Sequence, residues 1–413
     1  MKHDVLVLGA GIVGVSAACH LAARGRSVAM VDLRGPGEET SFGNTGVIER
    51  SALLPIPFPR DAKFLVELAF GMRPHAHYHP LALPNLAPWL WAYFKSSSPA
   101  GREASARALR PLVDRSLAEH EALMEAAGSL DYLRRDGWIA LYRTAKSLAG
   151  EEHDLQLARE LRVPYEVHGM RETQALEAGL APVFEAGILW PSTATVSDPG
   201  AVTKSYAALA ETRGVRILIG DARTLVRSAG GWTVQSAEGP VSASQALVAL
   251  GAWSPQVLEP LGIVLPLASK RGYHMHFSFS PPGLTRPIVD SDGGFAMSPM
   301  LRGIRLTTGI EFAERDAPPT PVQVERALPF ARQILPGLGE KLDPQPWLGR
   351  RPCFPDSLPV IGPAPGRADL FLAFGHQHLG FTLGPVSGRL VAELMTGAEP
   401  VVDPSAYRAE RFG

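Results

Sequence analysis

The sequence is poor in cysteine, in net charge and in long apolar runs. Its two cysteines in 413 residues, Cys19 and Cys353, cannot form a disulfide framework or a four-thiolate metal site. Lysine and arginine together number 40 and aspartate and glutamate 41, so the formal charge of −1 gives no overall attraction for nucleic acid. No apolar run reaches the roughly 20 residues that span a bilayer. We therefore exclude an integral membrane protein and expect no nucleic-acid partner.

The composition is that of an ordinary globular protein, with 46% hydrophobic and 20% charged residues. The apolar stretch Val5–Ala18 behind Lys2 is similar to a secretion signal, but glycines interrupt it and it contains the best motif of the chain. We therefore expect a cytoplasmic protein. Histidines occur in groups with alternate spacing that match no common zinc motif, and we predict no metal. These groups are His75, His77 and His79, then His274 and His276, and then His376 and His378.

The first 35 residues follow the order strand, glycine turn, helix, strand, acid. Val5–Leu8 is a short apolar run typical of a strand buried on both faces. The pattern G-x-G-x-x-G follows at residues 9–14 and opens into an alanine-rich helix over 15–24. A second strand over 27–31 ends at Asp32, which follows the last glycine of the pattern by 18 residues. This order predicts the dinucleotide-binding unit of a Rossmann-like fold.

Each part of this unit has a physical role. The first glycine permits a tight turn, the second lets a pyrophosphate approach the backbone, and the third lets the helix pack on the strand. The helix amino terminus offers free N–H groups to the phosphates. Asp32 is expected to accept hydrogen bonds from the adenosine ribose and to repel a 2′-phosphate, which favours NAD or FAD over NADP. The predicted phosphate-binding residues are Gly9, Ala10, Gly11, Ile12, Val13 and Gly14.

The remaining chain does not continue the simple alternation of strand and helix. Apolar periodicity predicts helices over 104–127, 199–212 and 381–395, and buried strands over 215–219, 245–250 and 371–374. Alternating patterns over 267–279 and 294–309 predict two long antiparallel strands. The aromatic residues Trp89, Trp91, Tyr93 and Phe94 are interpreted as core or interface rather than as a binding site.

We predict an α/β (α+β) fold with two domains. A Rossmann-like nucleotide-binding domain is expected from three separated segments, 1–52, 196–262 and 349–413. A substrate-binding domain, with a mixed or antiparallel sheet and inserted helices, is expected from 53–195 and 263–348. Side-chain preference would depend on the irregular segments 53–100 and 290–302.

Six short motifs in order give the chain a resemblance to a known family. They are V-L-G-A-G-I-V-G-V at Val7, E-T-S-F-G-N-T-G at Glu39, V-A-L-G-A-W-S at Val248, K-R-G-Y at Lys270, G-R-R-P-C-F-P-D-S-L-P-V-I-G at Gly349 and G-H-Q-H-L-G-F-T-L-G-P at Gly375. Over nearly its whole length the chain resembles the FAD-dependent D-amino-acid oxidase family, and within it the D-amino-acid dehydrogenase branch. Glycine and sarcosine oxidases belong to the same family.

The resemblance implies FAD held without a covalent bond. In the sarcosine oxidase branch a cysteine tethers the flavin, but the matching position here is Gly349, so Cys353 is expected to be a packed thiol. A helix amino terminus aimed at the flavin would stabilise the negative charge of its reduced form. The further cofactor-binding residues that the resemblance implies are Asp32, Leu33, Arg34, Thr40, Ser41, Asn44, Thr45, Gly46, Arg223, Leu250, Gly251, Trp253, His378, Gly380, Phe381, Thr382 and Leu383.

On the substrate side, the resemblance places Arg351 at the position of the carboxylate-binding arginine. A guanidinium suits this role because it pairs with a carboxylate through two parallel hydrogen bonds. Tyr273 is expected either to donate a hydrogen bond to the same carboxylate or to pack in the sheet. His376 and His378 flank the flavin turn, where they either tune charge and touch substrate or have a buried structural role.

The implied activity is oxidation of a D-amino acid, or a secondary amine such as D-hydroxyproline, by hydride transfer from its α-carbon to flavin N5. Electrons would pass to a quinone or a carrier protein, with possible peripheral contact at the cytoplasmic face of the inner membrane. The alternatives are a glycine or sarcosine oxidase that releases hydrogen peroxide, an NAD-dependent dehydrogenase, and a non-catalytic flavin-binding subunit of an oxidoreductase complex.

Overall fold

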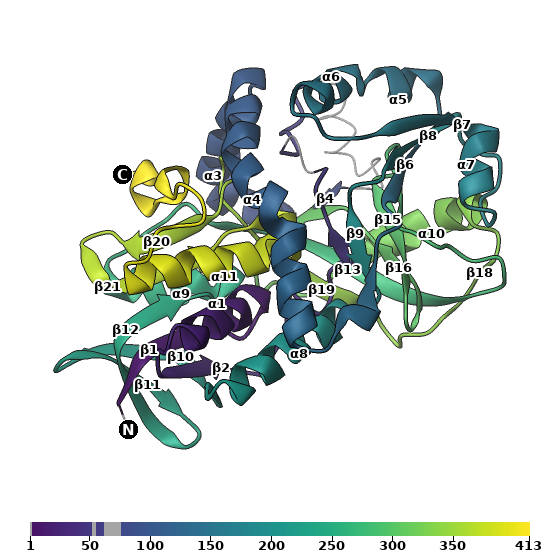
Figure 1. Cartoon of the computed structure of the whole chain (residues 1–413). Helices are drawn as coiled ribbons and strands as arrows, with labels where there is room; N and C mark the ends of the chain where they lie inside the picture. The colour runs from purple at the N-terminus through teal and green to yellow at the C-terminus, as the bar shows by residue number, and fades with distance from the viewer. Residues whose placement is uncertain (1, 52–54, 62–75) are drawn as a thin grey trace.

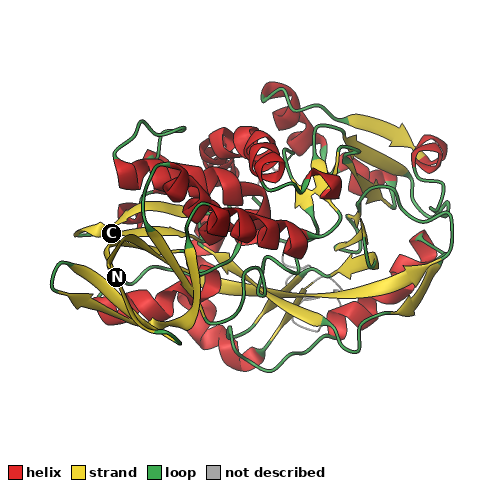
Figure 2. Ribbon diagram, turned by 60° about the horizontal axis from the view of Figure 1, so that its bottom comes forward, coloured by secondary structure: helices red, strands yellow, loops and turns green. Residues whose placement is uncertain are grey.

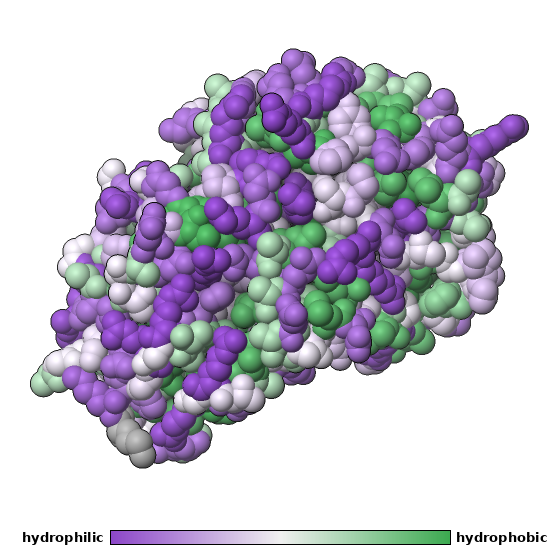
Figure 3. Space-filling view, viewed as in Figure 1, coloured by the Kyte–Doolittle hydropathy of each residue, from purple (hydrophilic) through white to green (hydrophobic). Residues whose placement is uncertain are grey.

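A computed structural model describes residues 2–51, 55–61 and 76–413. Two large sheets organise these residues, one of seven strands and one of eleven, and a small three-stranded sheet adjoins them (Figures 1 and 2). The mixed architecture confirms the predicted fold class. On the face seen in Figure 3, polar side chains are interspersed with small apolar areas. Among the described helices, none has both the length and the apolarity needed to cross a bilayer.

The seven-stranded sheet has a parallel core drawn from three separated stretches of the chain. β1 (Lys2–Leu8) pairs in parallel with β2 (Val28–Asp32) and β12 (Gly239–Val248). β10 (Arg216–Ser228) extends the sheet beyond β2, and β21 (Arg367–Phe374) extends it beyond β12. Antiparallel strands complete the sheet, namely β11 (Gly231–Ser236) and β20 (Val360–Ala364). The predicted strands of the nucleotide-binding domain therefore form one sheet.

Helices cover one face of this sheet. α1 (Ile12–Ala23) packs between α8 (Pro199–Thr212) and α11 (Gly380–Thr396), and α4 (Pro99–Ala126) lies against α11 (Figure 1). The approach of α11 to α1 is close, because a Cβ added at Gly388 would lie 2.6 Å from the backbone nitrogen of Ala17. All four predicted helices, over 15–24, 104–127, 199–212 and 381–395, are present.

The start of α4 differs from its prediction by five residues. The helix begins at Pro99 rather than at residue 104, because the side chain of Ser98 accepts a hydrogen bond from the Gly101 backbone N–H. Proline at the first helical position has no N–H to leave unpaired, so Ser98 and Pro99 together form a favourable amino-terminal cap. The first turn of the helix is polar, so apolar periodicity did not predict that the helix begins there.

β13 (Ala268–Phe279) is the central strand of the second sheet and pairs with four neighbours. The prediction of one long strand over 294–309 is wrong in part, because this stretch forms a hairpin whose turn ends at Gly303, with a φ of +132° that favours glycine. The other strands are β4 (Ala76–Tyr78), β6 (Trp138–Tyr142), β7 (Glu166–Gly169), β8 (Ala186–Trp190), β14 (Ile288–Asp290), β15 (Phe295–Met300), β16 (Gly303–Thr307), β17 (Ile310–Phe312), β18 (Leu338–Lys341) and β19 (Trp347–Cys353).

The junction between the two sheets positions the site. β19 pairs with β13 over seven residues, so the domain boundary proposed at residue 349 falls inside a strand of the second sheet. The small sheet also lies near the junction and consists of β3 (Val47–Ile48), β5 (Leu133–Arg134) and β9 (Ala194–Val196). The remaining α-helices of the described residues are α3 (Leu83–Ser96), α5 (Ala145–Ala149), α6 (Glu152–Glu160), α7 (Met170–Leu176), α9 (Ser254–Leu258) and α10 (Val322–Ile334).

Candidate active site

A cavity of about 710 Å³ extends from the glycine turn of the first sheet to β13 and β19 of the second. This volume is typical of ligand and cofactor sites, which usually measure roughly 300–1,000 Å³. Most of the predicted cofactor residues line it. They are Gly9, Ala10, Gly11, Ile12, Val13, Asp32, Leu33, Arg34, Thr40, Ser41, Asn44, Thr45, Arg223, Leu250, Gly251, Trp253, His378, Gly380, Phe381 and Thr382.

The glycine turn has the geometry that its sequence implies. Gly9 has a φ of +105°, and a Cβ there would lie 2.6 Å from the carbonyl oxygen of Ala249. A Cβ at Gly14 would lie 1.9 Å from the Gly9 carbonyl oxygen, so glycine is what allows α1 to pack on the turn. At Gly11 the nearest atom to an added Cβ is the Ser41 hydroxyl, 3.4 Å away, and that Cβ would project into the cavity. The turn thus leaves space beside the helix amino terminus for a phosphate group.

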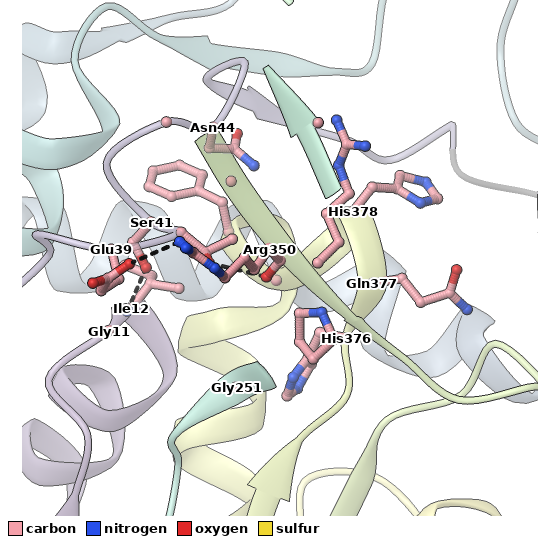
Figure 4. A pocket seen from close by; sticks show the side chains of 18 of the residues that line it. Gly11, Ile12, Glu39, Ser41, Asn44, Gly251, Arg350, His376, Gln377 and His378 are labelled. Atoms are coloured by element: carbon pink, nitrogen blue, oxygen red, sulfur yellow. Dashed lines mark hydrogen bonds and ion pairs between the residues drawn. The ribbon is translucent and has the colours of Figure 1, made fainter. Parts of the chain in front are cut away.

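Side chains from two other segments hold the turn in place. Asp32 accepts a hydrogen bond of 2.7 Å from the backbone N–H of Ala10. The Ser41 hydroxyl accepts one of 3.0 Å from the backbone N–H of Ile12 (Figure 4). Burial raises the pKa of Asp32, and backbone hydrogen bonds from Ala10 and Arg34 oppose this rise. One carboxylate oxygen bonds the turn and the other the Arg34 N–H, so both fix the carboxylate at the cavity wall.

The loop at residues 39–46 connects the nucleotide turn with the second sheet. The Thr40 hydroxyl donates to the carbonyl of Arg350 at 3.0 Å, and the Asn44 side chain accepts from the backbone N–H of Gly46 at 2.8 Å. Arg305 on β16, which the sequence interpretation did not single out, donates to the carbonyls of Phe42 and Asn44. Gly14, Gly46 and Leu383 do not line the cavity, and Leu383 is fully buried in the core.

The turn before α11 carries two histidines whose imidazoles are neutral at pH 7. His376 is buried, and its Nε2 lies 2.9 Å from the hydroxyl of Ser387, while burial lowers its pKa to about 3. Burial and the nearby cations Arg351 and Lys270 lower the pKa of His378 to about 4. Both histidines line the cavity, together with the first residues of α11 (Figure 4). The hydrogen bond of His376 favours its structural interpretation.

Arg351 is a partly buried cation on β19 whose side chain lines the cavity. Its guanidinium donates to the carbonyl of Gly309 at 2.8 Å, and burial lowers its pKa. It lies over Gly272 of the K-R-G-Y motif, where an added Cβ would be 2.7–2.9 Å from the guanidinium atoms. Among the described residues it has no carboxylate partner. A buried charge without a counter-ion is costly, so this arrangement indicates an anionic ligand.

Tyr273 lines the cavity, but other side chains occupy its hydroxyl. The hydroxyl donates to Glu311 at 2.9 Å and accepts from the backbone N–H of Thr320 at 2.8 Å. Arg271 is fully buried and forms an ion pair of 2.7 Å with Glu311. The contacts therefore favour the interpretation in which Tyr273 packs in the sheet.

The same network brings His77 and His79 close to Glu311, with potential ligand atoms within 4.8 Å of one another. The Glu311 carboxylate already bonds Arg271, Tyr273 and Thr320. The guanidinium of Arg271 would repel a cation at this position, which argues against a bound metal ion. The absence of a metal stays a prediction. His75, the third member of this histidine group, lies outside the described residues.

Two ionisable residues of the cavity were missed in the sequence. Lys270 on β13 is only 4% exposed, and burial lowers its pKa to about 8. Glu49 follows β3, and burial raises the pKa of its carboxyl to about 7. The Glu49 backbone N–H donates to the hydroxyl of Thr382 at 3.1 Å, which ties the residue to the start of α11. Lys270 opens the K-R-G-Y motif, but the sequence interpretation assigned it no role, and Glu49 belongs to no motif, so only the fold reveals that both line the cavity.

Both cysteines are free thiols buried in the protein, as predicted. Cys353 also lines the cavity. Burial raises its pKa, although Lys270 and Arg351 act in the opposite direction. Its backbone carbonyl accepts a hydrogen bond of 3.0 Å from the Trp89 indole N–H. The residue therefore fixes the wall of the cavity near the two cations.

Residues 4–394 match the model of the FAD dependent oxidoreductase family called DAO. The chain belongs to this family. It is 30% identical over 424 residues to a D-amino-acid oxidase of Bradyrhizobium diazoefficiens, with 99% of each chain covered. It is also 30% identical to a D-amino acid dehydrogenase of Rhizorhabdus wittichii over 420 residues, covering 99% of this chain and 100% of the relative. Membership confirms FAD as the cofactor and excludes the NAD-dependent alternative.

The fold agrees with this assignment. The structure is similar to the crystal structure of glycine oxidase from Geobacillus kaustophilus, with a TM-score of 0.77, 21% identity, and coverage of 99% of this chain and 98% of that chain. The chain is thus an FAD-dependent enzyme that oxidises amino acids. The glycine turn, the acid at the end of β2 and the open space at Gly11 fit the adenosine diphosphate part of FAD.

Proposed function

We propose that this enzyme oxidises a D-amino acid, or a related secondary amino acid, to the corresponding imino acid. The Arg351 guanidinium, which faces the cavity without a carboxylate partner among the described residues, carries this proposal. It would bind the α-carboxylate of the substrate through two hydrogen bonds. FAD, when bound, supplies the acceptor for the hydride of the α-carbon. The two relatives named for D-amino acids support this handedness.

The protein contributes mainly by positioning the substrate and excluding water. Gly272 leaves the space in which the Arg351 guanidinium lies, and the Gly309 carbonyl fixes the direction of its fork. Once the carboxylate is held, the α-hydrogen has a defined orientation, and such positioning alone removes a large part of the barrier. The neutral histidines of the α11 turn do not add positive charge that would compete with Arg351 for the carboxylate.

A panel of amino acids tests the substrate class and the electron acceptor. The purified enzyme is expected to absorb at about 450 nm and to reduce an artificial dye with D-amino acids or D-hydroxyproline, but not with the L-enantiomers. We propose a quinone or a carrier protein as the acceptor, at the cytoplasmic face of the membrane. Equal rates of dye reduction with and without oxygen, and little hydrogen peroxide, are the expected results. Strong peroxide formation with glycine or sarcosine would favour an oxidase instead.

Glu49 is placed to accept the proton of the substrate ammonium group. Its carboxylate lines the cavity and forms no ion pair among the described residues. The pKa of its carboxyl is about 7, so the group is protonated at lower pH and ionised above. Because only the ionised form accepts a proton, kcat/KM is expected to rise about tenfold per pH unit below about 7 and to level off above.

The pH profile of Glu49→Gln checks this role. The glutamine variant should lose the inflection near pH 7, and its activity should instead follow ionisation of the free substrate amine at higher pH. Glu38→Gln serves as the control, because Glu38 lines the distal part of the cavity and pairs with Lys204 at 2.6 Å. A Glu49→Gln profile that coincides with that of the wild type would remove Glu49 from the mechanism.

A further inference from the structure

A second cation lies directly opposite Arg351. In the antiparallel pairing of β13 with β19, Lys270 is the residue opposite Arg351. Opposed residues of such a pair point to the same face of the sheet, with Cβ atoms about 4.5–5.5 Å apart, and like charges in this arrangement destabilise the fold. Both side chains line the cavity. The two cations therefore face one space and repel each other unless an anion lies between them.

The surroundings of Lys270 compensate its charge only in part. Its ammonium nitrogen lies 3.7 Å above the ring centroid of Tyr93 and 5.3 Å from that of Trp89. These aromatic faces attract a cation, but more weakly than the loss of water around a buried ammonium disfavours it. The ionisable neighbours that affect its pKa are Cys353 and Arg351, and neither is a carboxylate. No described acidic side chain forms an ion pair with Lys270.

The aromatic contacts also show why the ammonium stays in place. Trp89 and Tyr93 lie against each other with ring centroids 5.0 Å apart, and the Trp89 indole is fixed by its hydrogen bond to the Cys353 carbonyl. Trp89 and Tyr93 on α3 therefore have the predicted core role and also contact the charged Lys270 side chain. A lysine held on two aromatic faces loses little further freedom when an anion binds to its remaining N–H groups.

We propose that Lys270 binds a second carboxylate of the substrate, so that the enzyme prefers amino acids that carry two carboxylates. In this arrangement Arg351 holds the α-carboxylate and Lys270 the second one, and the cross-strand pair sets their separation. The inference rests on the proposed oxidation of D-amino acids and specifies its substrate class. A dianionic ligand would neutralise both cations at once, which explains why the fold tolerates them side by side.

Substrate pairs of equal shape test this preference. For the wild type, kcat/KM for D-glutamate is expected to exceed that for D-glutamine, and that for D-aspartate to exceed that for D-asparagine, by about 10- to 100-fold, the effect of one charge-assisted hydrogen bond. Lys270→Met should lower this ratio to about one by reducing turnover of the acidic substrates alone. Lys270→Arg should keep most of the ratio. Lys341→Met, an exposed lysine on the neighbouring strand β18, is the matched control.

The possible outcomes separate this inference from the proposed function. Oxidation of D-amino acids without preference for the acidic partner would overturn the dicarboxylate inference and leave the proposed function intact. Failure of every D-amino acid would overturn the proposed function itself. A Lys270→Met variant that binds FAD normally, yet loses acid and amide activity equally, would show that Lys270 serves the flavin rather than a second carboxylate. The FAD content, from absorbance at about 450 nm, is measured for each variant.

Discussion

Replacing Arg351 with lysine is expected to raise the KM for the amino acid about 10- to 100-fold while FAD content stays unchanged. Lysine keeps the positive charge but loses the planar fork that binds a carboxylate through two parallel hydrogen bonds, and a charge-assisted bond contributes about 1.5–3 kcal/mol. Steady-state kinetics with a D-amino acid measure the effect. Arg302→Lys, at the exposed turn between β15 and β16, is the control. Unchanged kinetics in Arg351→Lys would contradict the assignment of Arg351.

Gly272→Ala reaches the same guanidinium from the opposite strand. The new methyl group would lie 2.7–2.9 Å from the Arg351 guanidinium, so this flexible side chain must move while the backbone stays in place. A displacement of about 1 Å can lower kcat/KM about 100-fold. Because Gly272→Ala and Arg351→Lys both disturb the Arg351 guanidinium, the double variant is expected to lose less activity than the two single losses combined. Fully additive losses would show that Gly272 acts elsewhere.

Alanine at Gly11 is expected to give a folded protein that does not bind FAD. The added Cβ meets only the Ser41 hydroxyl at 3.4 Å, so the fold can accept it, but it occupies the space next to the amino terminus of α1. Loss of absorbance at about 450 nm, with a melting temperature equal to that of the wild-type apoprotein, is the expected result. Retention of FAD would place the phosphates elsewhere.

Gly14→Ala provides the contrast. Its Cβ would lie 1.9 Å from the carbonyl oxygen of Gly9, so the helix and the turn must separate. We expect this variant to lose FAD and also to melt below the wild-type apoprotein, because overpacking of this size forces the backbone to shift. Thermal unfolding of both apoproteins distinguishes the two cases. Equal melting temperatures for the Gly11 and Gly14 variants would contradict their separate roles.

The nucleotide half of the molecule was largely predictable because its signals are local. The order of strand, glycine turn, helix, strand and acid fixes hydrogen bonds within the first 41 residues, such as those from Ala10 to Asp32 and from Ile12 to Ser41. The local structural preference of each of these residues agrees with the fold, and such agreement allows the fold to be predicted from the sequence. The hairpin of β15 and β16 was missed because Leu301, which is exposed in its turn, continues the apolar alternation of Phe295 and Met297.

The substrate half was less predictable because its contacts are distant in sequence. Tyr273 was expected to have either a substrate contact or a packing role. Only the structure shows that its hydroxyl bonds Glu311 and Thr320, and these contacts favour packing. Glu49 carries no motif, and its place in the cavity follows from the pairing of β3 and from the Thr382 hydrogen bond. The resemblance located Arg351, but its lack of a described counter-ion was visible only in the structure.

The sequence by itself determined that this chain builds a dinucleotide-binding unit, that its cysteines form no disulfide framework, and that a guanidinium lies near its far end. Tertiary structure decided the chemistry facing the substrate. The register of β13 against β19 sets Lys270 across from Arg351, and packing on α3 supplies the aromatic faces beneath the ammonium. The physical reason is that strand register and burial depend on contacts between residues about 80 to 180 positions apart, which no local sequence pattern specifies.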